Sequence, residues 1–458
     1  MAGAQPVKPA GTPKVTDVVT DHLKIRYENE VAATPDGLVS FVVQIEPRPG
    51  MHVYAPGAAG YQVINLAIDE HVRVRPRPLQ YPASGIYHFQ PLNEKIPVYE
   101  KSFTLRLDAV AQKAAEPLAV TGRLQYQACD DRVCFAPASV PLSWTVPLGS
   151  SASTAFAQTT VVRDVRVAIG CTSYPCSPKA DFSEGEAILA RYRAAHGDTS
   201  QALEALSWLG RAALAAGRLD QAQAYATDAY DRSVERSKAR PIAGDVSLEN
   251  ALGAAIEVQG HVRAAQGRRS DAVYFLRREL ETYRHTPLHM RIQKNINLLS
   301  LEGQPAPALA IGSELGRPTP SLASLKGSVV ILFFWAHWCG DCKAQGPILS
   351  ALLDRHRAAG VTIVAPTQHY GYTVPLAPAT PAAELAYIGQ VRNQYYAFLR
   401  DEAVPVSDAN HKLYGVSTTP TLVVVDRQGI VRLYHPGTMT ADELEAVIKP
   451  LLAARGAN

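Results

Sequence analysis

Six cysteines give this chain its clearest capacity for chemistry, and they fall into three close pairs. The pairs are Cys129 with Cys134, Cys171 with Cys176, and Cys339 with Cys342. Six cysteines among 458 residues are too few for a scaffold held together by disulfides. Two cysteines close in sequence can exchange between dithiol and disulfide, so each pair predicts either a redox site or a local bridge.

The last pair forms a CxxC motif between a predicted strand, 329–334, and a predicted helix, 341–356. The unpaired N–H groups at a helix N-terminus favour a thiolate, so Cys339 is the predicted nucleophile. Cys342, one turn into the helix, is placed to attack the mixed disulfide and release the product. A zinc site would need another Cys or His pair at ligand spacing, and none follows. A structural bridge is the other alternative.

The residues around this motif, 304–458, predict an α/β domain with a central sheet. We expect strands at 329–334, 361–365, 422–426 and 430–434, and helices at 341–356, 381–396 and 441–454. A CxxC that follows a buried strand and opens a helix has the context that redox chemistry requires.

This region resembles the thioredoxin-fold domains of the TlpA/ResA-type thiol:disulfide reductases. The resemblance rests on the WCxxC core at 338–342, the segments 303–307 and 415–421, and the turn at 426–429. It implies that Pro420 is cis and faces the dithiol. It also implies that the client is bound by Trp338 and by backbone hydrogen bonds from Thr419.

Three residues depart from the pattern of that family. Asp341 stands where proline is common, and its carboxylate disfavours a nearby thiolate, which predicts a reductant rather than a strong oxidant. Phe333 replaces the buried acid of thioredoxins, and Gln345 replaces the Glu of ResA-like proteins. Asp341 or His369 is then the candidate proton acceptor for the second cysteine. His369 belongs to a loop, 366–380, that reads as a substrate lip or as an aromatic-rich surface loop.

Residues 17–148 contain short alternating runs separated by turn signals, which predict a β-sandwich. The four residues between Cys129 and Cys134 allow a hairpin to bring the two sulfurs within bonding distance. The pair is predicted to be redox-active, and a structural bridge is the alternative.

This N-terminal region resembles the N-terminal domain of DsbD, the membrane thiol:disulfide interchange protein. The resemblance rests on the cysteine motif, the segment His52–Tyr54 and the strand 140–142. It implies an immunoglobulin-like sandwich whose cysteine pair relays electrons between thioredoxin-fold partners. It also implies that aromatic residues cap the sulfurs, for which Tyr54 and Phe135 are the candidates.

Residues 149–181 read as a linker, rich in Ser, Thr, Pro and Gly around one β-like run at 159–169. This linker carries Cys171 and Cys176. A structural loop disulfide is the preferred interpretation of that pair, and a third relay dithiol is the alternative.

Residues 182–303 are rich in Ala, Leu, Arg and Glu with helical periodicity, which predicts packed helix pairs. Two similar stretches, 215–222 and 265–272, place small residues, a glycine and a later aromatic at matching positions. They resemble tetratricopeptide-type repeats, at an irregular offset of 50 residues.

Charge and hydropathy exclude other classes of protein. The 45 Lys and Arg residues nearly balance the 42 Asp and Glu residues, which argues against a nucleic-acid groove or an acidic tail. The longest apolar run, 329–336, has eight residues, whereas a membrane-spanning helix needs about 20. Residues 1–16 read as a disordered leader, and we expect an exported, periplasmic protein whose signal peptide has been removed.

The sequence as a whole predicts a multidomain thiol:disulfide oxidoreductase, acting as a reductase or electron relay on protein disulfides. The expected catalytic residues are Cys339, Cys342, Cys129 and Cys134. Sulfur suffices for this chemistry, so no metal or organic cofactor is expected. The expected partners are disulfide-containing client proteins and a separate membrane or exported electron donor. The alternatives are a disulfide oxidase or isomerase, and a helical-repeat scaffold with structural disulfides.

Overall fold

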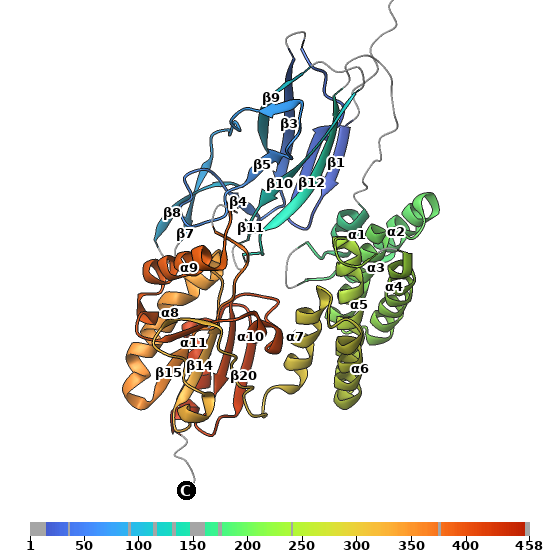
Figure 1. Cartoon of the computed structure of the whole chain (residues 1–458). Coiled ribbons are helices and arrows are strands. Elements are labelled where there is room, and N and C mark those ends of the chain that lie inside the picture. The colour runs from blue at the N-terminus through green and yellow to red at the C-terminus, as the bar shows by residue number, and fades with distance from the viewer. Residues whose placement is uncertain are drawn as a thin grey trace, which may run out of the picture. The chain divides into compact units, whose positions relative to one another are not determined.

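The structure is a computed structural model of the chain (Figure 1). It describes residues 15–34, 37–89, 93–112, 117–130, 134–146, 161–172, 176–239, 241–373 and 377–453. The chain divides into two compact units, and the second contains Val161–Asn458. A sheet-rich N-terminal region, a helical middle and a C-terminal α/β region follow one another, in the predicted order. Within the described ranges, no helix is long and apolar enough to cross a membrane.

The N-terminal region is built from strands in which one face is buried. Its strands are β1 (Val15–Val19), β2 (Leu23–Glu28), β3 (Leu38–Pro47), β4 (His52–Tyr54), β5 (Asn65–Ile68), β6 (Val74–Pro76), β7 (Gly85–Phe89), β8 (Glu94–Tyr99), β9 (Phe103–Ala111), β10 (Leu118–Tyr126), β11 (Ala128–Cys129) and β12 (Ala138–Val146). They form sheets of order β1-β2-β3-β9-β6, β12-β10-β5 and β11-β4-β8-β7. Burial alternates along β3 and β10 because successive side chains point to opposite faces. The buried faces meet in one core around Phe41 and Trp144, whose ring centroids are 4.8 Å apart.

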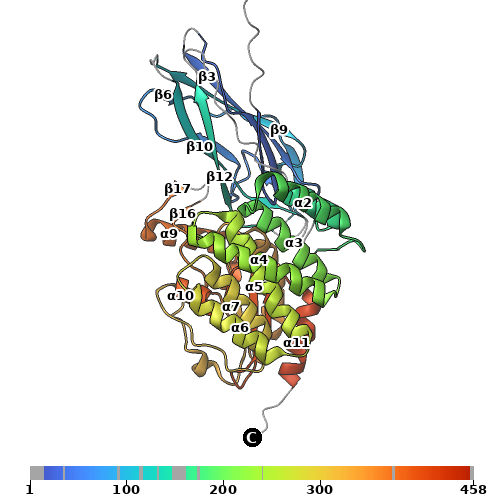
Figure 2. The ribbon, with the colours of Figure 1, turned by 90° about the vertical axis from the view of Figure 1, so that its right-hand side faces the viewer.

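The middle region is helical. Its helices are α1 (Val161–Ile169), α2 (Ser183–His196), α3 (Ser200–Ala215), α4 (Leu219–Ala239), α5 (Val246–Ala265), α6 (Arg269–Thr282) and α7 (Leu288–Ser300). Figure 2 shows α3, α4 and α5 packed side by side. The two similar stretches of sequence form equivalent corners, because Gly217 (φ 72°) follows α3 and Gly267 (φ 79°) follows α5. Glycine adopts this left-handed conformation without strain, which lets each helix end sharply before its partner begins.

The prediction of a β-like run at 159–169 was wrong. Val161–Ile169 is helix α1, and its residues Val161, Val165 and Ile169 are buried at helical spacing. The run of valines suggested a strand, but packing of this apolar stripe against α2 and α3 decides the conformation. The helical region therefore begins at Val161 rather than at residue 182, and the segment 161–172 is part of it rather than a linker.

The C-terminal region contains one six-stranded sheet of order β13-β18-β15-β14-β19-β20. Its strands are β13 (Ser313–Gly316), β14 (Val329–Phe334), β15 (Val361–Val364), β18 (Ala403–Val406), β19 (Thr421–Val425) and β20 (Val431–Pro436), with a small hairpin of β16 (Tyr372–Thr373) and β17 (Ala377–Pro378). Its helices are α8 (Gly340–His356), α9 (Pro381–Tyr395), α10 (Asp408–Leu413), α11 (Ala441–Ala453) and the short η2 (Leu322–Leu325), η3 (Arg357–Ala359) and η4 (Ala397–Leu399). Every residue of β14 is buried, and this strand runs parallel to β15 and antiparallel to β19. This is the thioredoxin arrangement that the sequence predicted.

Helix α7 belongs to the same compact unit as the C-terminal sheet. Leu301, directly after α7, lies in a core cluster with Val330 and Val423 of the sheet. Gly415 (φ 61°) approaches α7 so closely that a Cβ there would lie 2.3 Å from the backbone nitrogen of Lys294. The second unit therefore joins the helical region to the thioredoxin region through a packed apolar contact.

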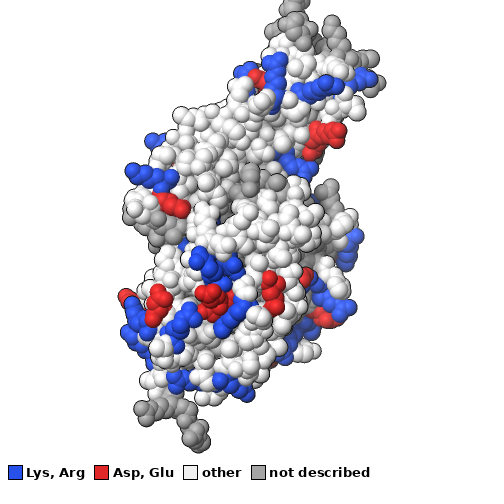
Figure 3. Space-filling model, turned by 60° about the vertical axis from the view of Figure 1, so that its left-hand side comes forward, with Lys and Arg blue, Asp and Glu red and all other residues white. Residues whose placement is uncertain are grey.

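Charged side chains of both signs are interspersed on the face of the molecule shown in Figure 3. Lys and Arg exceed Asp and Glu by only three, so neither sign dominates the composition.

Candidate active site

The Cys339–Cys342 pair is a disulfide at the N-terminus of α8. Cys339 is the N-cap residue of the helix, and the backbone N–H of Cys342 donates a hydrogen bond to Cys339 Sγ over 3.1 Å. The sequence places the sulfur there because the buried strand β14 ends at Phe334 and the helix starts at Gly340. In the reduced state this N–H and the helix dipole favour the thiolate of Cys339.

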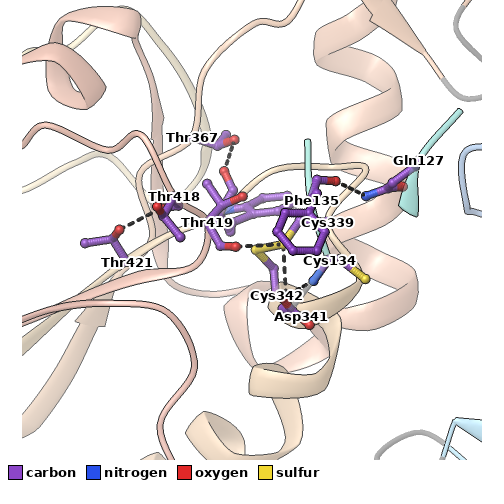
Figure 4. The surroundings of a disulfide bond; sticks show 11 residues. Gln127, Cys134, Phe135, Cys339, Asp341, Cys342, Thr367, Thr418, Thr419 and Thr421 are labelled. Carbon is purple, nitrogen blue, oxygen red and sulfur yellow. Dashed lines mark hydrogen bonds between the residues drawn. A yellow bond between two sulfur atoms is a disulfide. The ribbon is translucent and has the colours of Figure 1, made fainter. Parts of the chain in front are cut away.

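A loop before β19 faces the dithiol (Figure 4). The Thr419–Pro420 peptide bond is cis, as the family resemblance implied. The carbonyl oxygen of Thr419 lies 3.4 Å from Cys339 Sγ. Thr421 Oγ1 donates to the carbonyl oxygen of Thr418 over 2.7 Å, which holds the loop at the start of the strand. The main chain of Thr419 therefore lies beside Cys339 Sγ.

The segment before the dithiol is held by the neighbouring strand. Thr367 Oγ1 donates to the carbonyl oxygen of Trp335 over 2.8 Å, and Trp335 Nε1 donates to the carbonyl oxygen of Ala365 over 3.1 Å. These bonds connect the end of β14 to the chain after β15. They fix the path of the residues that lead to Cys339.

The two buried positions that differ from the family pattern serve packing. Gln345 donates from Nε2 to the carbonyl oxygen of Met439 over 3.1 Å and accepts from the N–H of Met439 over 2.8 Å. It thus anchors α8 to the segment before α11, and a neutral amide does not accept a proton at physiological pH. Phe333 is fully buried, and its ring lies against that of Tyr396 with centroids 5.8 Å apart.

Of the two predicted modulators, Asp341 lies in the first turn of α8, and His369 lies beside another carboxylate. His369 Nδ1 is 3.4 Å from Glu384 Oε2, on the first turn of α9. The same carboxylate is 3.2 Å from His337 Nε2. The structure thus places His369 in a cluster with Glu384 and His337, two residues that sequence reasoning did not single out.

Three tyrosine rings surround the imidazole of His337 edge-on. Their centroids lie 5.4 Å (Tyr370), 5.5 Å (Tyr372) and 5.4 Å (Tyr387) from that of His337. Burial lowers the pKa of His337, although the hydrogen bond with Glu384 acts in the opposite direction. The imidazole is therefore neutral at pH 7. A histidine beside a CxxC motif and an acid at the start of a predicted helix were the available signals, but 47 residues separate them.

In the N-terminal region, Cys129 lies on β11 and pairs with His52 of β4. Both Cys129 and Cys134 are disulfide-bonded. The hydroxyl of Tyr54 lies 3.1 Å from Cys129 Sγ, and its ring lies against Tyr61 with centroids 4.6 Å apart. Tyr54 thus touches the sulfur that it was predicted to cap.

The second candidate for a cap, Phe135, has a different set of neighbours. Its N–H donates to the carbonyl oxygen of Ala128 over 2.9 Å, and its carbonyl oxygen accepts from Gln127 Nε2 over 3.1 Å. Its ring centroid lies 4.3 Å from that of His22. These contacts hold the chain on both sides of the cysteine motif.

The remaining pair, Cys171 and Cys176, forms a disulfide directly after α1. Cys171 is buried in the helical core with Val165 and Ile169, and its carbonyl oxygen accepts from Arg166 Nε over 3.0 Å. The core around this disulfide is distinct from the core around Cys339 and Cys342.

Comparison with protein families places both terminal regions. Residues 24–141 match the model for the N-terminal region of the thiol:disulfide interchange protein DsbD, and residues 319–451 match a thioredoxin-like domain. Both resemblances read from the motifs are thereby confirmed. The chain is a thiol:disulfide oxidoreductase.

Individual relatives of this oxidoreductase carry related names. It is 29% identical over 159 residues to the thiol:disulfide interchange protein DsbE of Xylella fastidiosa (strain Temecula1), covering 34% of this chain and 71% of that protein. It is 28% identical over 144 residues to the thiol-disulfide oxidoreductase ResA of Oceanobacillus iheyensis, and the match covers 31% of this chain and 66% of that protein. A solved thioredoxin-family thiol:disulfide interchange protein from Chlorobium tepidum has 24% identity, covers 33% of this chain and 97% of that one, and has a TM-score of 0.26.

Proposed function

We propose that this oxidoreductase reduces disulfides in client proteins, or relays electrons between thioredoxin-fold partners, through Cys339 and Cys342. The observation that carries the proposal is the position of Cys339 Sγ. It accepts a hydrogen bond from the first turn of α8 and lies beside the main chain of Thr419 next to a cis-proline. This combination supplies an activated sulfur and a backbone surface for an extended client chain.

The reaction is two successive thiol–disulfide exchanges. The Cys339 thiolate attacks one sulfur of the client disulfide, which forms a mixed disulfide and releases the other client sulfur as a thiolate. Cys342 then attacks Cys339 Sγ, which breaks the mixed disulfide, releases the second client thiol and closes the Cys339–Cys342 disulfide. Two electrons pass to the client, and a reducing dithiol must return the pair to its starting state.

A reductant rather than an oxidant is supported by Asp341 in the first turn of α8. A carboxylate near the dithiol disfavours the thiolate, and a less stable thiolate makes the reduced pair easier to oxidise. In this proposal Trp338 and Thr419 contact the client, while Pro420 shapes the loop that presents Thr419. Asp341 and His369 modulate proton transfer at the dithiol.

The N-terminal pair, Cys129 and Cys134, is proposed to be the second redox site, in a sandwich of immunoglobulin type. The match of residues 24–141 to the DsbD N-terminal model and the Tyr54 hydroxyl at Cys129 Sγ support this role. In one form of the proposal this pair exchanges electrons with Cys339 and Cys342. In the other, each end of the chain serves its own partner.

The remaining parts of the chain support this exchange. The equivalent corners at Gly217 and Gly267 favour helical repeats of tetratricopeptide type, which would space the redox modules or hold a client. The burial of Cys171 in the helical core favours a structural role for the Cys171–Cys176 disulfide. The proposal also includes an exported, periplasmic protein that receives electrons from a separate donor, in keeping with the match of residues 24–141 to the DsbD N-terminal model.

The decisive test is the reduction potential of the Cys339–Cys342 pair, measured against glutathione in the full chain with Cys129 and Cys134 both changed to Ser. If the protein is a reductase, the potential should be about −270 mV, as in thioredoxin. A potential of about −120 mV would instead establish a disulfide oxidase. If mild reductant opens neither terminal pair in the folded wild-type protein, the molecule is a scaffold with structural disulfides.

A further inference from the structure

We propose that Glu384 is a positioning residue that ties the loop 369–371 to the segment preceding Cys339. It thereby holds the ring of Tyr370, the aromatic lip, beside the dithiol. This inference rests on the proposed function, because it assigns the lip a part in binding the client. No step of the exchange chemistry passes through Glu384 itself.

The carboxylate of Glu384 is the meeting point of three chain segments. Glu384 lies in the first turn of α9 and is almost fully buried. It accepts hydrogen bonds from the backbone N–H of Tyr370 over 2.5 Å and of Gly371 over 2.9 Å. It also lies 3.2 Å from His337 Nε2 and 3.4 Å from His369 Nδ1. One side chain of α9 therefore fixes both the loop after β15 and the segment that enters α8.

The N-terminus of α9 does not require these contacts of Glu384 for its own stability. An acid in the first turn of a helix is stabilised by the helix dipole, and an exposed side chain obtains that benefit as well. The end of α9 is already capped by Thr380, whose side chain accepts from the N–H of Ala383. Glu384 instead turns toward backbone donors of another segment, so it sets the conformation of that loop.

The loop reaches the dithiol through a short chain of ring contacts. Tyr370 packs edge-on against His337 and against Trp338, with ring centroids 5.4 Å apart in both pairs. Trp338 immediately precedes Cys339. If Glu384 no longer held the N–H of Tyr370, the Tyr370–Trp338 contact would lose its support, and the lip beside the sulfur would move.

The charge states agree with this role. Burial would raise the pKa of Glu384, but hydrogen bonds from His337, Tyr370 and Gly371 outweigh it and lower that pKa, so the carboxylate is ionised at neutral pH. His337 is neutral there, because burial lowers its pKa, although the hydrogen bond with Glu384 acts in the opposite direction. A neutral imidazole can donate one N–H to the carboxylate and remain in an apolar ring cage.

The variant Glu384→Gln tests the proposal in the full chain. An amide can accept at its single oxygen, but its NH₂ group cannot accept from a second backbone N–H. The matched control is Glu443→Gln, since Glu443 is an exposed acid near the start of α11 that accepts hydrogen bonds from the N–H and the hydroxyl of Thr440. His337→Phe is an intermediate variant, because it keeps a ring in the cage and removes one donor to Glu384.

Hydrogen exchange of the segment 366–373, followed by mass spectrometry, measures the loop directly. Glu384→Gln should exchange about tenfold faster there than the wild type, His337→Phe less so, and Glu443→Gln not at all. Unchanged exchange in a folded Glu384→Gln would overturn the inference, whether or not the protein reduces disulfides. Thermal unfolding, followed by circular dichroism, shows whether Glu384→Gln folds. If it does not fold, the exchange of the segment 366–373 is compared between His337→Phe and the wild type instead.

Kinetics with insulin as the disulfide probe test the part that concerns the client. We expect Glu384→Gln to raise the KM for insulin several-fold, while the reduction potential of Cys339–Cys342 stays at the wild-type value. An unchanged KM beside faster exchange would overturn the role in client binding. Failure of the wild type to reduce insulin would count against the proposed function, and the exchange result would still decide the role of Glu384.

Discussion

The two terminal cysteine pairs present their sulfurs on different kinds of backbone. Cys339 caps a helix, and its Sγ accepts the N–H of Cys342 at 3.1 Å. Cys129 lies on the short strand β11, and its Sγ is 3.1 Å from the hydroxyl of Tyr54. A helix N-terminus stabilises a thiolate through its dipole, whereas a strand offers no comparable field. Under the proposed function, this difference supports attack on a client by Cys339 and electron exchange with a thioredoxin-fold partner by the N-terminal pair.

Replacement of the first cysteine of each pair is the strongest way to break this comparison. Cys339→Ser should lower insulin reduction by at least about a thousandfold, since no other group replaces the attacking sulfur. Cys129→Ser should leave insulin reduction driven by dithiothreitol close to wild type. A loss of similar size in both variants would show that the two sites act as one, which a stopped assay with each single variant would reveal.

The dependence of stability on pH offers a comparison of two buried histidines, His52 in the N-terminal region and His411 in the C-terminal region. Burial lowers the pKa of His411 near β14 and of His52 on β4, in each case to about 4. The unfolded chain binds these protons below about pH 6.5, so stability is complete above that pH and is lost as the pH falls through about 4.

The expected loss is about 3 kcal/mol for each histidine. It can be measured by urea unfolding at pH 7 and pH 4. His411→Phe should flatten the pH dependence in the C-terminal unit, and His52→Phe should flatten it in the N-terminal region. Equal pH dependence in a variant and the wild type would contradict the assignment for that histidine.

Replacement of the third pair, Cys171 and Cys176, tests whether its disulfide is structural or redox-active. Changing Cys171 and Cys176 together to Ser should lower the free energy of unfolding by about 2 kcal/mol, as expected for so short a loop. The rate of insulin reduction per folded molecule should not change. If that rate fell while the stability stayed constant, the pair would instead be a third relay site.

The smallest expected effect concerns the tyrosine at the N-terminal pair. Tyr54→Phe removes the hydroxyl at Cys129 Sγ, and one such hydrogen bond is worth about 1 kcal/mol. The equilibrium constant between the N-terminal pair and glutathione should therefore shift by about fivefold, with the Cys339–Cys342 pair unchanged. A shift at the C-terminal pair as well would mean that the two pairs equilibrate with each other.

The position of the Cys339–Cys342 pair could be predicted because its context is local. A buried strand, a CxxC motif and an amphipathic helix follow one another within the segment 329–356, so adjacent residues determine the position of Cys339. The cis-proline at Pro420 followed from family resemblance rather than from any local physical rule. Helix α1 was mispredicted because its valines favour a strand locally and its helical conformation depends on packing against α2 and α3.

The cluster around Glu384 shows what sequence could not supply. His337 and Glu384 meet only because α9 packs beside the entry to α8, and the backbone donors of Tyr370 and Gly371 have no signature in the sequence. The role of Gln345 was hidden for the same reason. Its partner is the backbone of Met439, 94 residues away.

Trapping of the mixed disulfide tests the central claim most directly. The chain with Cys342→Ser, reduced and then mixed with insulin, cannot resolve the first covalent product. We predict a stable adduct in which mass spectrometry locates the bond between an insulin cysteine and Cys339. An adduct at Cys129 or Cys134 with none at Cys339 would contradict the assignment of Cys339 as the nucleophile.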